Sequence, residues 1–212
     1  MKRFFGHPST QWDDISDLLH IYHVIRPDTP LSSVMSDLDS HLSSLTCLGV
    51  QPRAYYHATI TQLPLPLSRL SQEHKESLIT DLDRVARDHR PWTLTFRPPI
   101  VKDYAVETIA DHTDQWQCLL DDIRAVCARH CGFLPPPPFG AHATLRYGIS
   151  EGENEQIRNA LGSSDPVEHV MDDFALVTVA QHRDWGGFTF EVIERFSLTS
   201  GSHKVVESTS RD

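Results

Sequence analysis

Hydrophobic and polar residues recur along the chain with two different periods, and the two periods predict different elements. Short runs of β-branched, aromatic and aliphatic residues, bounded by Pro, Gly or Asp, predict strands. These strands are expected at residues 18–25, 55–63, 92–96, 101–109, 141–147, 174–180 and 188–196. Apolar residues spaced three or four apart predict amphipathic helices. These helices are expected between Pro30 and Gly49 and at residues 68–89, 111–131 and 151–161.

The order of these elements indicates a mixed α/β chain of two similar halves. Each half runs strand, helix, strand, helix, and we see no linker between them. We therefore expect one folding unit over residues 18–199. Residues 1–17 are expected to be an extension, packed through Phe4, Phe5 or Trp12. The polar, Ser-rich residues 200–212 are expected to be a disordered tail.

A short motif, His-Ala-Thr followed by an aliphatic residue, occurs on one strand of each half. The copies are His57–Ile60 and His142–Leu145. Because side chains alternate along a strand, each histidine should share a face with the threonine two residues on. The expected histidine faces carry Tyr55, His57, Thr59 and Thr61 in the first copy and His142, Thr144 and Arg146 in the second. The opposite, mostly apolar faces carry Tyr56, Ala58 and Ile60, and Ala143, Leu145 and Tyr147.

Two imidazoles and two hydroxyls brought together suit phosphodiester chemistry. Histidine has an unperturbed pKa near ~6.5, so one imidazole can accept a proton while the other donates one. Threonine hydroxyls can donate hydrogen bonds to the non-bridging oxygens of a phosphate. This chemistry needs no metal.

In these two motifs, and in its order of elements over roughly residues 18–199, the chain resembles the two-histidine (2H) phosphoesterases. These include the 2'-5' RNA ligase-like proteins and the cyclic nucleotide phosphodiesterases. The resemblance implies an α+β, bilobal fold with two-fold pseudo-symmetry, in which two antiparallel sheets line a central cleft and helices lie outside. It places four catalytic residues at the cleft floor, namely His57, Thr59, His142 and Thr144. Family members often have proline before the motif histidine, where this chain has Tyr56 and Ala141, so the subfamily stays open.

Five further residues are candidates for substrate binding. Arg146 could neutralise a phosphate or, equally, pair with a nearby carboxylate. Tyr55 could contact the substrate or simply fill the cleft wall, and Tyr22 could help to orient the substrate or be only a half-buried strand residue. Phe139, before the second motif, and Trp185, beside a Gly-Gly turn, could stack on a nucleobase or only pack within their loops. Such stacking is typically worth ~1–3 kcal/mol per base.

Composition restricts the partners. A formal net charge of -10 argues against a protein that coats nucleic acid. No apolar run is long enough for a signal peptide or a membrane span, and the cysteines show no disulfide framework, so we expect a cytoplasmic protein. Cys127, His130 and Cys131 lack a second ligand pair at zinc-site spacing. We expect no metal and no cofactor.

These observations predict a metal-independent phosphoesterase. Its substrate is expected to be an RNA end or a small nucleotide with a 2',3'-cyclic phosphate or a 2'-5' linkage, and ligation would use the same groups in reverse. Two alternatives stay open. One is a hydrolase of cyclic or 2'-5' oligonucleotide signals. The other belongs to a different class, an RNA- or nucleotide-binding module without turnover. We expect a monomer.

Overall fold

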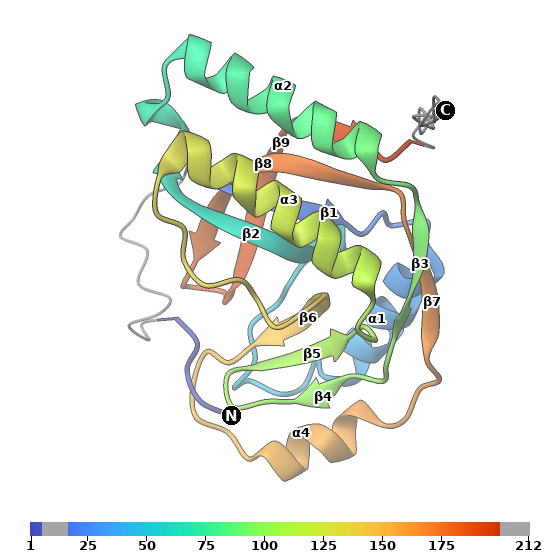
Figure 1. The fold of residues 1–212 in the computed structure, drawn as a ribbon. Helices are drawn as coiled ribbons and strands as arrows, with labels where there is room; N and C mark the ends of the chain where they lie inside the picture. The colour runs from blue at the N-terminus through green and yellow to red at the C-terminus, as the bar shows by residue number, and fades with distance from the viewer. Residues whose placement is uncertain (6–16, 200–212) are drawn as a thin grey trace, which may run out of the picture.

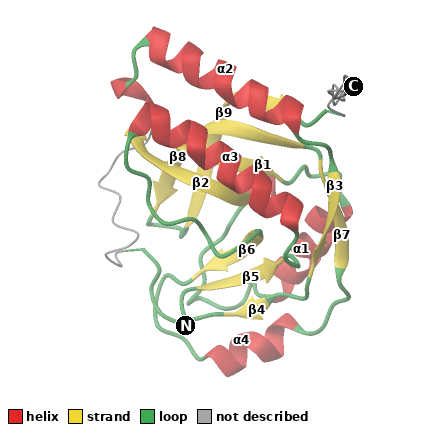
Figure 2. Ribbon diagram, in the orientation of Figure 1, coloured by secondary structure: helices red, strands yellow, loops and turns green. Residues whose placement is uncertain are grey.

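Strands and helices alternate along the computed structural model, which describes residues 1–5 and 17–199 (Figures 1 and 2). The strands are β1 (Leu18–Val24), β2 (His57–Pro66), β3 (Trp92–Phe96), β4 (Ile100–Val101), β5 (Ala105–Ile109), β6 (His142–Tyr147), β7 (Val167–Met171), β8 (Asp173–His182) and β9 (Gly187–Ser197). The helices are α1 (Pro30–His41), α2 (Gln72–Asp88), α3 (Asp114–Cys131) and α4 (Asn154–Leu161), with short 3-10 turns at Arg53–Tyr55 and Leu67–Arg69.

The strands form two antiparallel sheets, so the predicted α+β class is confirmed. The larger sheet has seven strands in the order β4-β5-β6-β2-β1-β8-β9, and the smaller one pairs β3 with β7. Both motif strands, β2 and β6, lie side by side in the middle of the larger sheet. Each has its own outer neighbour, β1 beside β2 and β5 beside β6, which gives the two halves their pseudo-symmetry.

The helices cover one face of this sheet. Figure 1 shows α2 and α3 side by side over the half that contains β2 and β9, while α1 contacts β6 and β7. Side-chain caps fix where the helices begin: Thr29, Ser71 and Thr113 each accept a hydrogen bond from a backbone N–H three residues on. The main apolar core lies between the helices and the sheet, and includes Ile60 and Leu145 of the motif strands. The other face of the sheet carries a second, largely aromatic cluster.

The sequence missed one strand. β7 alternates between inward Val167, His169 and Met171 and outward Glu168 and Val170. His169, a polar residue at an inward position, interrupts the hydrophobic alternation, so the sequence pattern does not predict this strand. The expected strand at 101–109 is divided by a turn into β4 and β5.

The first residues pack against the aromatic cluster. Phe5 is buried, with ring centroids 5.8 Å from Tyr147 and 5.6 Å from Phe188, and Phe4 also contacts both rings. Trp12 and the tail at 200–212 lie outside the described residues. No helix in the described parts of the chain is long and apolar enough to cross a lipid bilayer.

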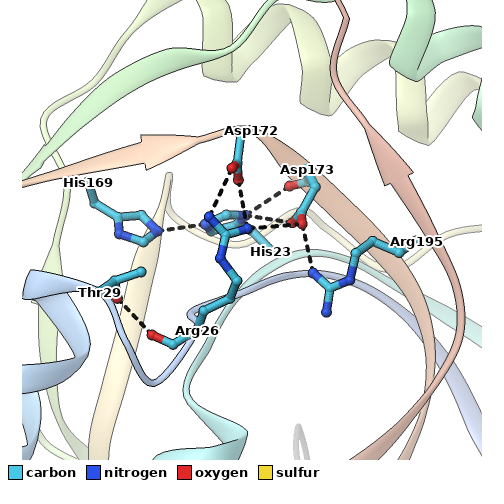
Figure 3. A network of polar contacts seen from close by, with 7 residues as sticks. All are labelled: His23, Arg26, Thr29, His169, Asp172, Asp173 and Arg195. Carbon is cyan, nitrogen blue, oxygen red and sulfur yellow. Dashed lines mark hydrogen bonds and ion pairs between the residues drawn. The ribbon is translucent and has the colours of Figure 1, made fainter.

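A polar network joins the two sheets where β1, β7 and β8 meet (Figure 3). His23 Nδ1 donates to the Asp173 carbonyl over 2.8 Å, and His23 Nε2 lies 2.7 Å from His169 Nε2. Arg26 binds both oxygens of Asp172, and Arg195 lies 2.7 Å from a carboxylate oxygen of Asp173.

Three members of this network have the donor types of a metal site. Their ligand atoms, on His23, Asp172 and Asp173, lie within 4.8 Å of one another. Arg26 and Arg195 already bring the positive charge that a cation would supply. We therefore interpret the network as structural.

Candidate active site

A cavity of about 370 Å³ lies on the face of the larger sheet that carries the aromatic cluster. All four predicted catalytic residues line it, and so do two of the predicted substrate-binding residues. These six are His57, Thr59, His142, Thr144, Tyr22 and Phe139. The structure thus brings together residues that the sequence separates by more than 80 positions.

The pairing of β2 with β6 explains how the four motif residues meet. Ala58 lies directly opposite Ala143 in an antiparallel register. One residue to either side, His57 faces Thr144 and Thr59 faces His142. Directly opposed residues have Cβ atoms roughly 4.5–5.5 Å apart. The four side chains therefore occupy the corners of a rectangle, with the two histidines on one diagonal and the two threonines on the other.

Both motif strands carry a β-bulge directly after the motif threonine. On β2, Thr59 pairs with Tyr22 and Thr61 with Ile21, so two residues of β2 span a single step of β1. On β6, Thr144 pairs with Glu107 and Arg146 with Val106, which is the same irregularity. A bulge shifts the alternation of side chains by one position. Residues after it therefore lie on the opposite face from the one that simple alternation predicts.

Because of the two bulges, the expected faces of Arg146, Thr61 and Tyr147 were wrong. Arg146 does not share the face of Thr144, but points to the helix side, where Nε lies 2.6 Å from an Asp39 carboxylate oxygen and Nη2 lies 3.1 Å from the other. Thr61 is also buried on the helix side, where its hydroxyl accepts from Arg124 of α3. Tyr147, expected on the apolar face, instead lines the cavity.

Backbone carbonyls fix the orientation of both motif imidazoles. His57 Nδ1 lies 2.8 Å from the carbonyl oxygen of Tyr55, and His142 Nδ1 lies 3.2 Å from that of Gly140. A carbonyl can only accept, so Nδ1 carries a hydrogen in each ring. In each case the partner is two residues before the histidine. The Nε2 atom of each ring is left for the substrate.

His57 is the more buried of the two histidines. Its ring stacks on Tyr22 with centroids 4.0 Å apart, and meets the edge of Phe190 at 5.6 Å. Burial lowers the pKa of His57 to about 4, opposed by the hydrogen bond to the Tyr55 carbonyl and reinforced by the charge of His142. His57 is therefore neutral at pH 7, while the partly exposed His142 faces more solvent.

Tyr22 connects the catalytic face to a further buried histidine. Its hydroxyl lies 2.8 Å from His20 Nδ1 and also hydrogen-bonds Thr59. Burial lowers the pKa of His20 to about 3, with a smaller contribution from His57, and burial raises the pKa of Tyr22. Both groups are thus neutral at pH 7, and they form a hydrogen-bonded chain that ends at the Thr59 hydroxyl.

The remaining aromatic candidates have different outcomes. Phe139 is 90% exposed at the cavity edge, free to stack on a ligand. Tyr55 lies in the 3-10 turn before β2, not in the strand, and its ring packs on Phe190, 5.3 Å away. Trp185 stacks on His182 in the β8–β9 turn, away from the cavity lining. The expectation of Tyr55 as a strand residue was wrong, while Trp185 follows the second of its two alternatives, packing within its loop.

Several cavity residues were not predicted as site residues. They are Phe4, Gln62, Tyr104, Ala105, Glu107, Pro136, Pro138, Tyr147 and Phe188. Gln62 and Tyr147 each stand five residues after the motif histidine, a shared spacing that becomes meaningful only once the bulges are known. Lys102 also lines the cavity. Arg53, in the turn before β2, binds Ser32 and the Pro27 carbonyl.

Solved structures of other proteins show the same arrangement of elements. The protein TT0787 of Thermus thermophilus matches with a TM-score of 0.68 and 18% sequence identity, over 88% of this chain and 100% of that one. E. coli LigT complexed with NADP+ gives a TM-score of 0.65 and 17% identity, over 86% and 98%. The MHV ns2 PDE domain gives 0.52 and 13%, over 76% and 98%. No family model and no curated protein matches the sequence.

The fold and the paired motifs together define a class. The chain has the fold of the two-histidine (2H) phosphoesterases, to which these solved structures belong. The resemblance inferred from the H-x-T motifs is thereby confirmed for the fold.

Proposed function

We propose that this protein is a metal-independent phosphodiesterase that hydrolyses 2',3'-cyclic phosphates or 2'-5' linkages in RNA ends or small nucleotides. The observation that carries the proposal is the rectangle of two histidines and two threonines in one cavity, with both Nε2 atoms available. These four groups supply every proton transfer and hydrogen bond that hydrolysis of a phosphodiester needs, so the reaction requires no metal.

The diagonal placement of the histidines fits a displacement at phosphorus. The attacking water and the departing oxygen lie on opposite sides of the phosphorus atom, so the base and the acid must also lie on opposite sides. The histidines at two opposite corners meet this requirement. The threonines at the other corners are placed to donate hydrogen bonds to the two non-bridging oxygens, where charge develops.

We assign His57 as the base and His142 as the acid for hydrolysis. His57 is neutral at pH 7, so its Nε2 can take a proton from water as the water oxygen bonds to phosphorus. The bond from phosphorus to the ribose oxygen then breaks, and that oxygen takes a proton from Nε2 of His142. In ligation the same two groups exchange roles.

The solved relatives are consistent with such ligands. LigT structures are described as complexes with 3'-AMP and with phosphate, and another similar structure is described as a phosphoesterase. Carried over to this chain, these descriptions favour a nucleotide phosphate in the cavity.

The test is turnover of adenosine 2',3'-cyclic phosphate and of a 2'-5'-linked diadenosine, in EDTA. His57→Asn and His142→Asn keep a side-chain N–H near the position of Nδ1 but remove Nε2. Each should lower kcat by about 10²–10⁴-fold. His74→Asn, at an exposed position of α2, is the matched control and should keep wild-type activity. Turnover that depends on a metal, or that survives either motif substitution, would rule the proposal out.

A further inference from the structure

The cavity around the catalytic residues is aromatic and carries almost no charge. Six aromatic side chains line it: Phe4, Tyr22, Tyr104, Phe139, Tyr147 and Phe188. Stacking on such rings suits nucleobases and is independent of phosphate charge. Of the lining residues that the structure describes, only Lys102 and Glu107 carry a permanent charge at pH 7.

These two charges cancel. Lys102 Nζ lies 2.9 Å from a Glu107 carboxylate oxygen, and the Glu107 side chain is only 12% exposed. Glu107 stands directly opposite Thr144 on β5, beside the expected position of the phosphate. The nearby Lys2 is also paired, with Asp103 at 2.9 Å. Neither lysine therefore offers an unbalanced positive charge to the substrate.

The arginine of the second motif strand is also removed from the cavity. Arg146, which is in the motif strand, is held on the helix side by Asp39. Residues 6–16, which lie outside the described part of the chain, contain no lysine or arginine in the sequence. The whole chain has a formal charge of -10. The negative charge of the whole chain therefore also disfavours a substrate that carries a second phosphate group besides the reacting phosphodiester.

A phosphate that enters such a site must find hydrogen bonds and countercharge to replace its water. A phosphodiester has one negative charge, which His142, as the proposed proton donor, and the hydrogen bonds of the two threonine hydroxyls can stabilise. A phosphomonoester nearby brings up to two more charges and would meet the Glu107 carboxylate. It would lose hydration with no cation to compensate.

We propose that the cavity selects phosphodiesters whose remaining groups are uncharged, such as a nucleoside 2',3'-cyclic phosphate or a dinucleoside 2'-5' phosphate without terminal phosphates. Glu107 is the specificity-determining residue, because it neutralises Lys102. This inference rests on the proposed function. The inference adds to the proposed function a discrimination against substrates that bear a further phosphomonoester.

The experiment compares two substrates on the same enzyme. One is adenosine 2',3'-cyclic phosphate, and the other is the same nucleotide with a 5'-phosphate. Wild type should show a kcat/KM at least about tenfold higher for the first. Glu107→Gln frees the charge of Lys102 and should reduce that ratio by about tenfold. The ratio on one enzyme cancels any general damage by the substitution.

Asp103→Asn is the matched control. It removes an equal charge and releases Lys2, which is outside the cavity lining, so the ratio should stay at the wild-type value. Equal kcat/KM for the two substrates in wild type, or an unchanged ratio in Glu107→Gln, would overturn the inference and leave the proposed function standing. If wild type hydrolyses neither this pair nor the 2'-5'-linked diadenosine, both proposals fail.

Discussion

Gln62 and Tyr147 occupy equivalent places in the two halves, each five residues after its motif histidine and each on the cavity side of its strand. The bulges after Thr59 and Thr144 bring them there. The same bulges turn Thr61 and Arg146 toward the helices. The pseudo-symmetry of the site thus extends beyond the motifs, although the paired residues differ in type.

Replacement of Arg146 distinguishes a structural from a substrate-binding arginine. Arg146→Met leaves the Asp39 carboxylate, of which 21% is exposed, without its bidentate partner. Because the pair is partly buried, we expect the free energy of unfolding to fall by about 1–3 kcal/mol, measured by urea denaturation. KM for a cyclic nucleotide should stay within about twofold of wild type, since the side chain lies away from the cavity.

The control for this variant is Arg97→Met. Arg97 pairs with Asp111 through two contacts of 2.7 and 2.8 Å, but both side chains are largely exposed, so the loss should be much smaller than for Arg146→Met. A large rise in KM for Arg146→Met, with little loss of stability, would instead show that Arg146 binds the substrate.

Removing one oxygen atom tests the chain from His20 to Thr59. Tyr22→Phe keeps the ring stacked on His57 but removes the hydroxyl that bonds His20 and Thr59. Without this partner the Thr59 hydroxyl is less well oriented toward phosphate. We expect kcat to fall about tenfold, since the proposed hydrogen bond from Thr59 to the charged phosphate is weakened, and such a bond is worth ~1.5 kcal/mol or more.

Tyr55→Phe serves as the comparison for Tyr22→Phe. It leaves the ring against Phe190 and the backbone carbonyl on His57. Its kcat should match wild type. Similar losses of kcat in both variants would mean that the Tyr22 hydroxyl has no particular role.

Gly140 holds the carbonyl that orients His142, and it does so with a φ of 64°. A side chain at such a φ costs about 1–2 kcal/mol, although a Cβ there would meet no other atom. Gly140→Ala should therefore move the backbone, misalign His142 and lower kcat, as measured by single-turnover hydrolysis. Gly162→Ala, at φ 73° and also in open space, should show the same loss of stability with normal kcat.

Three buried histidines predict that the fold weakens in mild acid. Burial lowers the pKa of His20 to about 3 and of His57 and His169 to about 4. In the unfolded chain a histidine has a pKa near ~6.5, so below that pH the unfolded state binds protons that the folded state does not. Stability should therefore be constant above pH 7 and fall between about pH 6.5 and pH 4.

The expected loss from pH 7 to pH 5 is of the order of 1 kcal/mol per histidine. Urea denaturation at the two pH values measures it. His169→Gln removes one of the three groups and should make the pH dependence shallower. A free energy of unfolding that does not change over this range would contradict the buried, neutral state of these histidines.

The sequence predicted that the four motif residues lie together, as they do in the cavity lining, because two features of the set are local. The motif spacing puts His57 and Thr59 on one face, and it does the same for His142 and Thr144, before either bulge is reached. The resemblance to the 2H phosphoesterases supplied the remaining step, the convergence of the two strands. Most strands and helices were also predicted from local information. The spacing of apolar residues shows which face of an element is buried, and so which type of element it is.

The residues that sequence reasoning misplaced depend on longer-range structure. Arg146 lies beyond a bulge, which hydrophobic alternation cannot reveal. β7 is a strand because it pairs with β3, more than 70 residues away in sequence, and because its inward His169 hydrogen-bonds His23. The Gly-Gly pair did place Trp185 in the β8–β9 turn, but its partner there, His182, is fixed only by the geometry of that turn.

The contact between Ala58 and Ala143 has a consequence for what the second motif position can hold. The two methyl groups lie on the buried side of the sheet, where the motif strands approach each other. A larger side chain at either place would have to displace the core between the sheet and the helices, while backbone hydrogen bonds keep the spacing of β2 and β6. The separation of the two motif histidines is thus a property of the sheet backbone, and the small alanines beside them in sequence leave room for the layer that supports it.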